Sequence, residues 1–143
     1  DNQDKAEAAG GIEVAMKNST KYVYNDTDKK FVFRALESMV AGNAKNLNKI
    51  RKSSVRIRDM VHNLFEYNTE SELVVTGFRL LVSLAADPEI QVELGWADVV
   101  NEVVKAMRRL LKCVEVQVQG SRALITITDR NEESQDRAGF AGA

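Results

Sequence analysis

Apolar residues recur at helical spacing in the middle of the chain, where Glu70 to Ala86 reads ESELVVTGFRLLVSLAA. Side chains three, four and seven positions apart share one face of a helix, whereas alternate side chains share a face of a strand. We therefore predict a helix that begins near Asn68 and Thr69, with a short helix starting at Asp87 and Pro88, since proline fits a first helical turn. The residues expected in its buried stripe are Leu73, Gly77, Leu80, Leu81 and Leu84.

Two other segments repeat this layout. Val114 to Thr128 matches it at a shift of 43 residues, and the segment around Arg34 matches it at a shift of 45 in the other direction. The stretches Gln3 to Gly11 and Gln135 to Ala143 match each other at a shift of 132, which is three times 44. A period of roughly 40 to 47 residues without strand or zinc signatures is typical of helical arrays. The chain is therefore expected to be all-α, with approximate repeats 10–54, 55–97 and 98–143.

The first repeat carries weaker helix signals. Asp1 to Ala9 reads as a short helix closed by Gly10 and Gly11, and a second helix is expected to start near Ile12. Asp28 is the expected N-cap of the third helix, which Gly42 and Asn43 end. Its predicted buried stripe is Val32, Ala35, Leu36 and Met39.

The second helices of the later repeats show clear amphipathic stripes. In the middle repeat the apolar residues are Ile57, Met60, Val61, Leu64 and Phe65, and in the last helix of this kind, Asp98 to Leu111, they are Val99, Val103, Met107 and Leu110. Trp96, in the turn between these repeats, is expected to pack between neighbouring units.

The segment from Val114 to Thr128 also fits a β-hairpin. Its valines alternate with polar residues before Gly120 and Ser121, and a second alternating run follows. The helical interpretation is preferred, because the same register occurs in the two earlier segments, where the alternation is absent. Glycine in a helix costs about 1 kcal/mol, so its recurrence at Gly77 and Gly120 indicates close approach of a neighbouring helix.

The motifs DRAGFAGA, VVNEVVKAM and VQVQGSRALITIT, together with the repeat length, resemble the armadillo family. That resemblance implies a right-handed α-solenoid of three-helix repeats, whose third helices line a concave groove that holds partner segments. It also implies that the chain is a segment excised from a longer array.

Composition narrows the function classes. The chain has 143 residues, a net charge of −1, one cysteine and one histidine. It contains no phosphate-binding glycine loop, HExxH, CxxC pair or nucleophile elbow, so we expect no enzyme activity, cofactor or metal site. Cys113 is read as a small packing residue and His62 as an exposed bystander. No run of about 18 apolar residues or signal peptide is present, so the protein is expected in the cytosol or nucleus, without a membrane span.

One constellation recurs in every repeat. An arginine is followed four positions later by a hydroxyl residue, so the two side chains lie one above the other on a helix. If the third helices line a groove, the arginines form a ladder suited to carboxylates, phosphates or carbonyl groups of an extended partner. The alternative is that each arginine bridges adjacent repeats through Glu37, Glu72 or Glu115. The six residues are Arg34 with Ser38, Arg79 with Ser83, and Arg122 with Thr126.

The resemblance offers a further comparison. Family members that bind basic nuclear-import signals carry Trp and Asn at the two positions, which this chain lacks in every repeat, so import-signal recognition is not expected.

The leading hypothesis is thus a non-catalytic protein-interaction scaffold with a protein or peptide partner and no small-molecule substrate. Binding of nucleic acid or an anionic lipid through a basic surface, or a role as the regulatory arm of a larger enzyme, stays open. We also expect the isolated fragment to self-associate, because helices that neighbouring repeats should cover would be bare. The basic surface would consist of Lys45, Lys49, Arg51, Lys52, Arg56 and Arg58.

Overall fold

The computed structural model describes residues 2–8, 10–21, 25–66, 68–95 and 97–129. These residues form nine α-helices and no strand, so the all-α prediction is confirmed for the described part of the chain. The expectations for Trp96 and for Gln135 to Ala143 lie outside the described residues.

The helices fall into three triplets that share one order, a short helix, a second helix and a long third helix. The third helices have 15, 14 and 15 residues. In chain order the bounds are α1 (Asn2–Ala8), α2 (Gly11–Asn18), α3 (Asp26–Val40), α4 (Ala44–Arg51), α5 (Ile57–Phe65), α6 (Ser71–Leu84), α7 (Pro88–Leu94), α8 (Ala97–Arg109) and α9 (Val114–Thr128).

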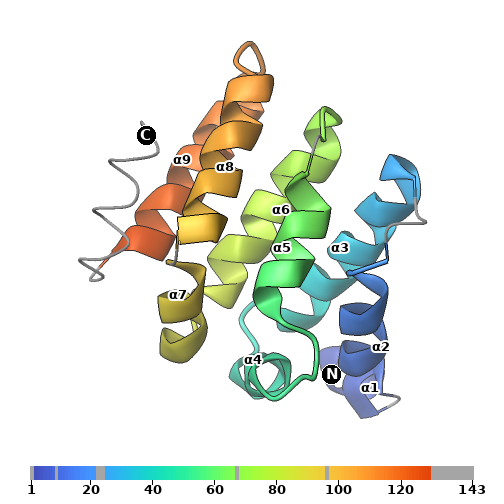
Figure 1. Ribbon diagram of the computed structural model, residues 1–143. Coiled ribbons are helices and arrows are strands. Elements are labelled where there is room, and N and C mark those ends of the chain that lie inside the picture. Colours follow the sequence, from blue (N-terminus) through green and yellow to red (C-terminus); the bar gives the residue numbers. More distant parts are fainter. Residues whose placement is uncertain (1, 9, 22–24, 67, 96, 130–143) are drawn as a thin grey trace.

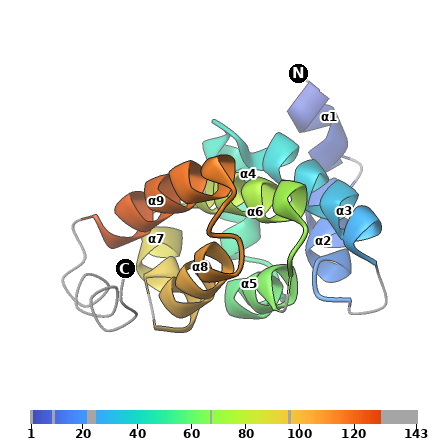
Figure 2. The same cartoon turned by 90° about the horizontal axis from the view of Figure 1, so that it is seen from above.

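The long helices stand side by side. Figures 1 and 2 show α3, α6 and α9 in one row and α2, α5 and α8 in a second row beside it, and in Figure 1 the short helices α4 and α7 lie below the lower ends of these helices. Helix α6 packs against both α3 and α9, and α5 packs against α8. Each long helix therefore contacts the long helix of the next triplet, and α5 contacts α8 in the same way.

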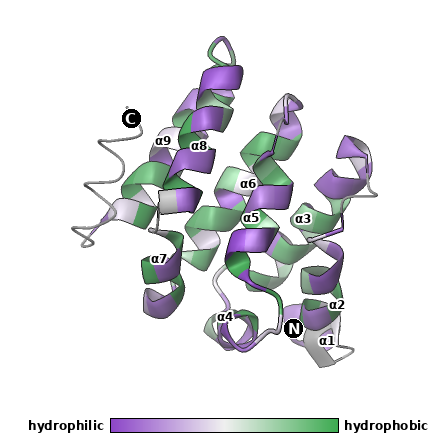
Figure 3. Cartoon of the chain, in the orientation of Figure 1, coloured by the Kyte–Doolittle hydropathy of each residue, from purple (hydrophilic) through white to green (hydrophobic). Residues whose placement is uncertain are grey.

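The core lies between the two rows, where the hydrophobic sides of the helices meet (Figure 3). All five residues of the predicted α5 stripe and all five of the predicted α6 stripe are buried. The rings of Phe65 on α5 and Phe78 on α6 lie 5.2 Å apart between centroids, a favourable distance for an aromatic pair. The periodicity of these two helices was therefore sufficient to identify their buried faces.

Gly77 and Gly120 lie where helices approach closely. A Cβ atom on Gly77 would lie 2.6 Å from Leu64 Cδ2 on α5, and one on Gly120 would lie 2.7 Å from Met107 on α8. Both distances are shorter than a carbon contact allows. The prediction that these glycines sit at helix crossings is confirmed.

The ambiguous segment at the end is helical. It forms α9 from Val114 to Thr128, which excludes the hairpin alternative. Val116 is buried, whereas Val114 and Val118 are exposed by 76% and 49%, so the alternating valines do not share a face. Only the helical period accounts for the buried set of Val116, Gly120, Ala123 and Ile127.

Helix α3 differs from its prediction in two respects. Its N-cap is Asn25 and not Asp28, because the Asn25 side chain accepts the Asp28 backbone N–H at 2.9 Å. Its buried residues are Phe33, Leu36 and Val40, whereas the predicted Ala35 is exposed and Val32 and Met39 are half-buried. The buried face is thus turned toward α2 and α6.

Two further boundaries were predicted with mixed success. Helix α6 begins at Ser71, after Asn68 and Thr69, because the Glu70 carboxylate accepts the backbone N–H of Leu73 at 2.7 Å and caps the helix. Asp87 caps α7 as predicted, and Pro88 occupies its first turn. The glycine turns after α1 and α3 are also confirmed, since Gly10 and Gly42 adopt φ values of 77° and 65°.

A pair of hydrogen bonds recurs in the first and last triplets. Gln3 donates from Nε2 to the carbonyl oxygens of Ser38 and Ala41, 35 and 38 residues later. Gln91 donates in the same way to Thr126 and Asp129, again 35 and 38 residues later. Each glutamine lies on a short helix and satisfies carbonyl groups at the end of the long helix of its own triplet. The sequence repeat is therefore matched by repeated contacts.

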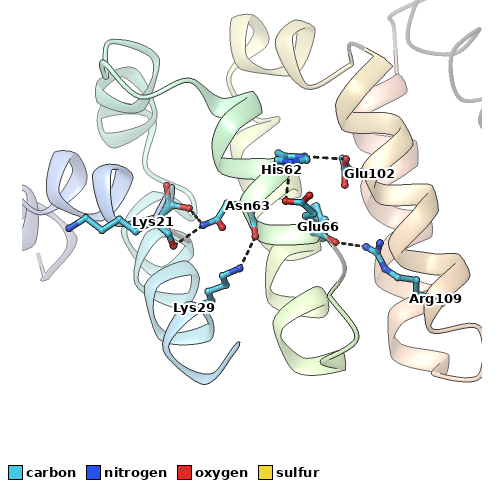
Figure 4. A network of polar contacts seen from close by, with 9 residues as sticks. Lys21, Lys29, His62, Asn63, Glu66, Glu102 and Arg109 are labelled. Carbon is cyan, nitrogen blue, oxygen red and sulfur yellow. Dashed lines mark hydrogen bonds and ion pairs between the residues drawn. The ribbon is translucent and has the colours of Figure 1, made fainter. Parts of the chain in front are cut away.

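Polar side chains also link the second row (Figure 4). Asn63 on α5, which is 1% exposed, donates from Nδ2 to the carbonyl of Ser19 at 2.6 Å, just after α2 ends. Arg109 on α8 donates to the carbonyl of Phe65 at the end of α5. Lys29 on α3 donates to the carbonyl of Asn63 at 3.2 Å. Carbonyl groups near the ends of α2 and α5 are in this way bound by side chains of a neighbouring triplet.

We predict that Gly120→Leu destabilises the protein by overpacking, by about 1 to 3 kcal/mol. The control is Ser121→Leu, which adds the same side chain at an exposed position of α9. Chemical denaturation monitored by circular dichroism measures both changes. If the two variants unfold at the same free energy, the crossing at Gly120 is not tight.

We predict that Asn63→Ala lowers the free energy of unfolding by about 1 to 3 kcal/mol, because the carbonyl of Ser19 would lose its donor in a buried position. Asp59→Ala, at an exposed position of the same helix, should cost no more than about 1 kcal/mol, the scale of a helix-dipole contribution. Equal costs in urea denaturation would contradict a role for the Asn63 contact.

Candidate functional site

The six predicted site residues all lie on the three long helices. Arg34 and Ser38 are exposed on α3, and Arg79 is exposed on α6 with Ser83 half-buried below it. On α9, Arg122 is exposed and Thr126 is half-buried. The long helices therefore present all three arginines to solvent, as the recurrence indicated.

Two hollows lie over the contact between α3 and α6, and together we call them the α3/α6 groove. One, of about 410 Å³, is lined by residues that include Lys30, Arg34, Glu72 and Arg79. The other, of about 510 Å³, is lined by Phe31, Arg34, Ala35, Glu37, Ser38, Thr76 and Arg79. Arg34 and Arg79 border both hollows, so the fold brings two of the three predicted arginines together.

The remaining predicted residues are arranged differently. Arg122 does not line the α3/α6 groove, and its guanidinium donates to Gln119 Oε1 of its own helix at 3.3 Å. The hydroxyl of Thr126 donates to the carbonyl of Arg122 at 2.8 Å, and that of Ser83 donates to Glu37 at 3.4 Å. The hydroxyls therefore do not form a uniform ladder beside the arginines.

Arg79 makes the bridging contact that was the alternative to ligand binding. Its Nη2 lies 3.2 Å from Oε1 of Glu115 at the start of α9, and both side chains are more than half exposed. Exposed ion pairs of this kind contribute about 0.2 to 1 kcal/mol. A ligand carboxylate could share the other guanidinium donors, since arginine has five.

Glu72 is held by a lysine and not by an arginine. Lys30 Nζ donates to Glu72 Oε2 at 2.7 Å, which links α3 to α6. This hydrogen bond and the positive charge of Lys30 lower the pKa of Glu72, and the charge of Arg34 adds to the effect. Glu72 is therefore ionised at neutral pH. Arg34 itself forms no ion pair with any residue that the structure describes.

The α3/α6 groove thus combines both signs of charge with an aromatic ring. Lys30, Arg34 and Arg79 line it together with Glu37, Glu72 and Glu115, and Phe31 on α3 is 60% exposed. Such a surface can donate hydrogen bonds from Arg34 to a carboxylate or carbonyl group and can cover an apolar side chain with Phe31.

Sequence reasoning missed Lys30 and Phe31. Lys30 lies four residues before Arg34 and Phe31 three residues before it, so both share the exposed side of α3 with the arginine. The helical register contained this signal. Neither residue recurs in the other two repeats, so the repeat pattern alone does not single them out.

The predicted basic surface is partly neutralised. Arg51 pairs with Glu89 at 3.2 Å and lies 3.9 Å from Asp87, and Arg58 pairs with Asp98 at 3.4 Å. Lys45 and Lys49 lie on α4, whereas Lys52 and Arg56 belong to the connection from α4 to α5. The run is therefore not one helix face, and at least two of its six charges are matched by acids.

His62 is exposed on α5 and lies close to two glutamates. Its Nε2 lies 3.1 Å from Glu66 and its Nδ1 lies 3.5 Å from Glu102 on α8 (Figure 4). The two carboxylates contact opposite ring nitrogens and do not converge on one point. Among the described residues no group of three His, Cys, Asp or Glu side chains is placed to hold a metal ion.

Cys113 is half-buried at the start of α9, where it borders the α3/α6 groove beside Glu115. Within the part of the chain that the structure describes, none of the helices has the length and apolar character that crossing a membrane requires. Comparison with protein-family models, with curated proteins and with solved structures found no match to this chain.

Proposed function

We propose that the chain is a segment of an armadillo-like, right-handed α-solenoid and acts as a non-catalytic scaffold that binds an extended protein segment. The bound segment would lie across α3 and α6, and its acidic side chains would meet Arg34 and Arg79. The observation that carries the proposal is the α3/α6 groove, which both arginines border.

The solenoid part of the proposal is supported by repetition at two levels. The three triplets share one order of helices, and the long helices stand in one row (Figure 2). The paired hydrogen bonds from Gln3 and Gln91 recur at identical separations along the chain. Repeated units that each contact the next unit are the arrangement of helical repeat proteins.

The proposed binding of acidic side chains is supported by the exposure of Arg34 and by its lack of an ion pair. Its guanidinium is exposed and makes no ion pair among the described residues, so carboxylate binding there would break no such pair. Each charge-assisted contact contributes about 1.5 to 3 kcal/mol before the entropy cost of ordering the peptide.

The spacing of the helices sets the expected ligand pattern. Packed helices lie about 10 Å apart, and an extended chain advances about 3.3 Å per residue. Carboxylates about three residues apart could therefore reach Arg34 and Arg79 in turn. An apolar residue beside the first carboxylate would lie near Phe31, which borders the same hollow as Arg34.

The basic-surface alternative has weaker support, because Arg51 and Arg58 are already paired with acids. Nucleic-acid binding through Arg51 or Arg58 would need those pairs to open. If the chain is instead the regulatory arm of a larger enzyme, it could use the same groove. The two hypotheses differ only in whether the segment belongs to a scaffold or to an enzyme.

We predict that peptides selected from a random display library will be enriched in acidic residues at a spacing of about three. A labelled copy of one selected peptide, measured by fluorescence anisotropy, should bind Arg34→Glu and Arg79→Glu at least about tenfold more weakly, which corresponds to about 1.4 kcal/mol. Lys45→Glu and Lys52→Glu are matched controls on the α4 side and should change the affinity little.

The groove would be refuted as the site if Arg34→Glu and Arg79→Glu bind the selected peptide normally. If Lys45→Glu and Lys52→Glu then weaken binding of a labelled oligonucleotide or anionic vesicles, with a steep dependence on salt, the basic surface takes its place. Circular dichroism of each variant separates lost binding from lost folding.

A further inference from the structure

The ion pairs beside the α3/α6 groove do not follow the sequence repeat. Arg34 and Arg79 occupy the same register, at a shift of 45 residues. Glu72 and Glu115 also correspond to each other, at a shift of 43. Arg79 on α6 pairs with Glu115 of the next long helix, with Nη2 3.2 Å from Oε1. The same contact one triplet earlier would join Arg34 to Glu72, but among the described residues Arg34 has no acid partner.

Lys30 takes the place of Arg34 in that contact. Its Nζ donates to Glu72 Oε2 at 2.7 Å, from a position one helical turn before Arg34 on α3. Residues four apart lie one above the other on a helix, so Lys30 and Arg34 present their side chains on the same side of α3. All three residues line the hollow of about 410 Å³. One acid therefore lies beside two cations and is bound by one of them.

The lysine has no counterpart in the other two triplets. Its register is filled by Val75 on α6, which is 7% exposed and belongs to the core, and by Val118 on α9. On α6 no cation stands one turn before Arg79, and Glu115 pairs with the arginine. The presence or absence of this one cation accounts for the different states of Arg34 and Arg79.

Glu72 is close enough to Arg34 to respond to its charge. The hydrogen bond and the charge of Lys30 lower the pKa of the Glu72 carboxyl most, and the charge of Arg34 lowers it further. The side chain of Glu72 is 70% exposed, so it can turn without opening a cavity in the core. Without Lys30, an ionised carboxylate would stand beside an exposed guanidinium, which is the arrangement that forms a pair at Arg79.

We propose that Lys30 is a positioning residue of the α3/α6 groove, because it holds Glu72 and so keeps Arg34 open for a carboxylate of the bound segment. Arg34 is then the first anchor of an acidic peptide. A carboxylate at Arg79 must instead displace Glu115 or lie beside it, where like charges repel. This inference rests on the proposed function, since it assigns an order to the two arginines of that site.

The first test needs no ligand. NMR titration of the full 143-residue chain measures the pKa of the Glu72 carboxyl. Arg34→Gln should raise this pKa slightly when Lys30 is present, because the lysine stays bound to Glu72. In the Lys30→Gln background the same change should raise it more, because Arg34 has become the partner of Glu72. Equal rises in the two backgrounds would overturn the proposal.

Peptide binding supplies the second test. The labelled acidic peptide selected from the display library should bind Lys30→Gln about two- to fivefold more weakly, which is the scale of an exposed ion pair that must open. With Glu72→Gln already in place, Lys30→Gln should leave the affinity nearly unchanged, since no acid remains to occupy Arg34. A lysine that contacts the peptide directly would weaken binding equally in both backgrounds, and that outcome would also overturn the proposal.

Lys17→Gln is the matched control, because it removes the same charge from an exposed position of α2 outside the lining of the groove. It should bind the peptide like the unchanged chain, and far-UV circular dichroism checks that each variant folds. If Arg34→Gln binds the peptide normally, the groove function itself fails. If Arg34→Gln weakens binding and Lys30→Gln does not, the groove function stands and the role of Lys30 is wrong.

Discussion

The close packing of α6 between α3 and α9 is the constraint on which the rest of the structure depends. Gly77 leaves room for Leu64 on one side, and Phe78 fills the space beside Gly120 on another. Burial of each large apolar side chain on α6 stabilises the fold by about 1.5 to 3 kcal/mol. This packing also sets the distance between α3 and α6, and therefore the distance between Arg34 and Arg79 in the groove.

Sequence periodicity predicted the helices whose buried faces are covered from both sides. The stripes of α5 and α6 were correct because every position at helical spacing meets either the other row or a neighbouring triplet. On α3 the helical spacing of apolar residues pointed to Ala35 and Met39, which correspond to buried residues on α6 and α9. Ala35 borders the open α3/α6 groove and Met39 packs against the edge of the core, so local surroundings and not register decide their burial.

Helical register predicted which side of a helix each candidate site residue occupies, but not which residues it contacts. Register places each arginine on the outer side of a long helix, and the structure agrees for all three. The partner of Arg79 is an acid 36 residues away, and Lys30 meets an acid 42 residues away. Those pairings depend on how far one helix is displaced along its neighbour, a quantity that no local pattern encodes. The same reason explains why the acids beside Arg51 and Arg58 were not foreseen.

The balance of charges in the groove determines what kind of recognition it can support. Three cations and three acids border it, so no strong field extends into solvent to attract ligands from a distance. Selectivity must then come from position, with a carboxylate placed at Arg34 and kept away from Glu72.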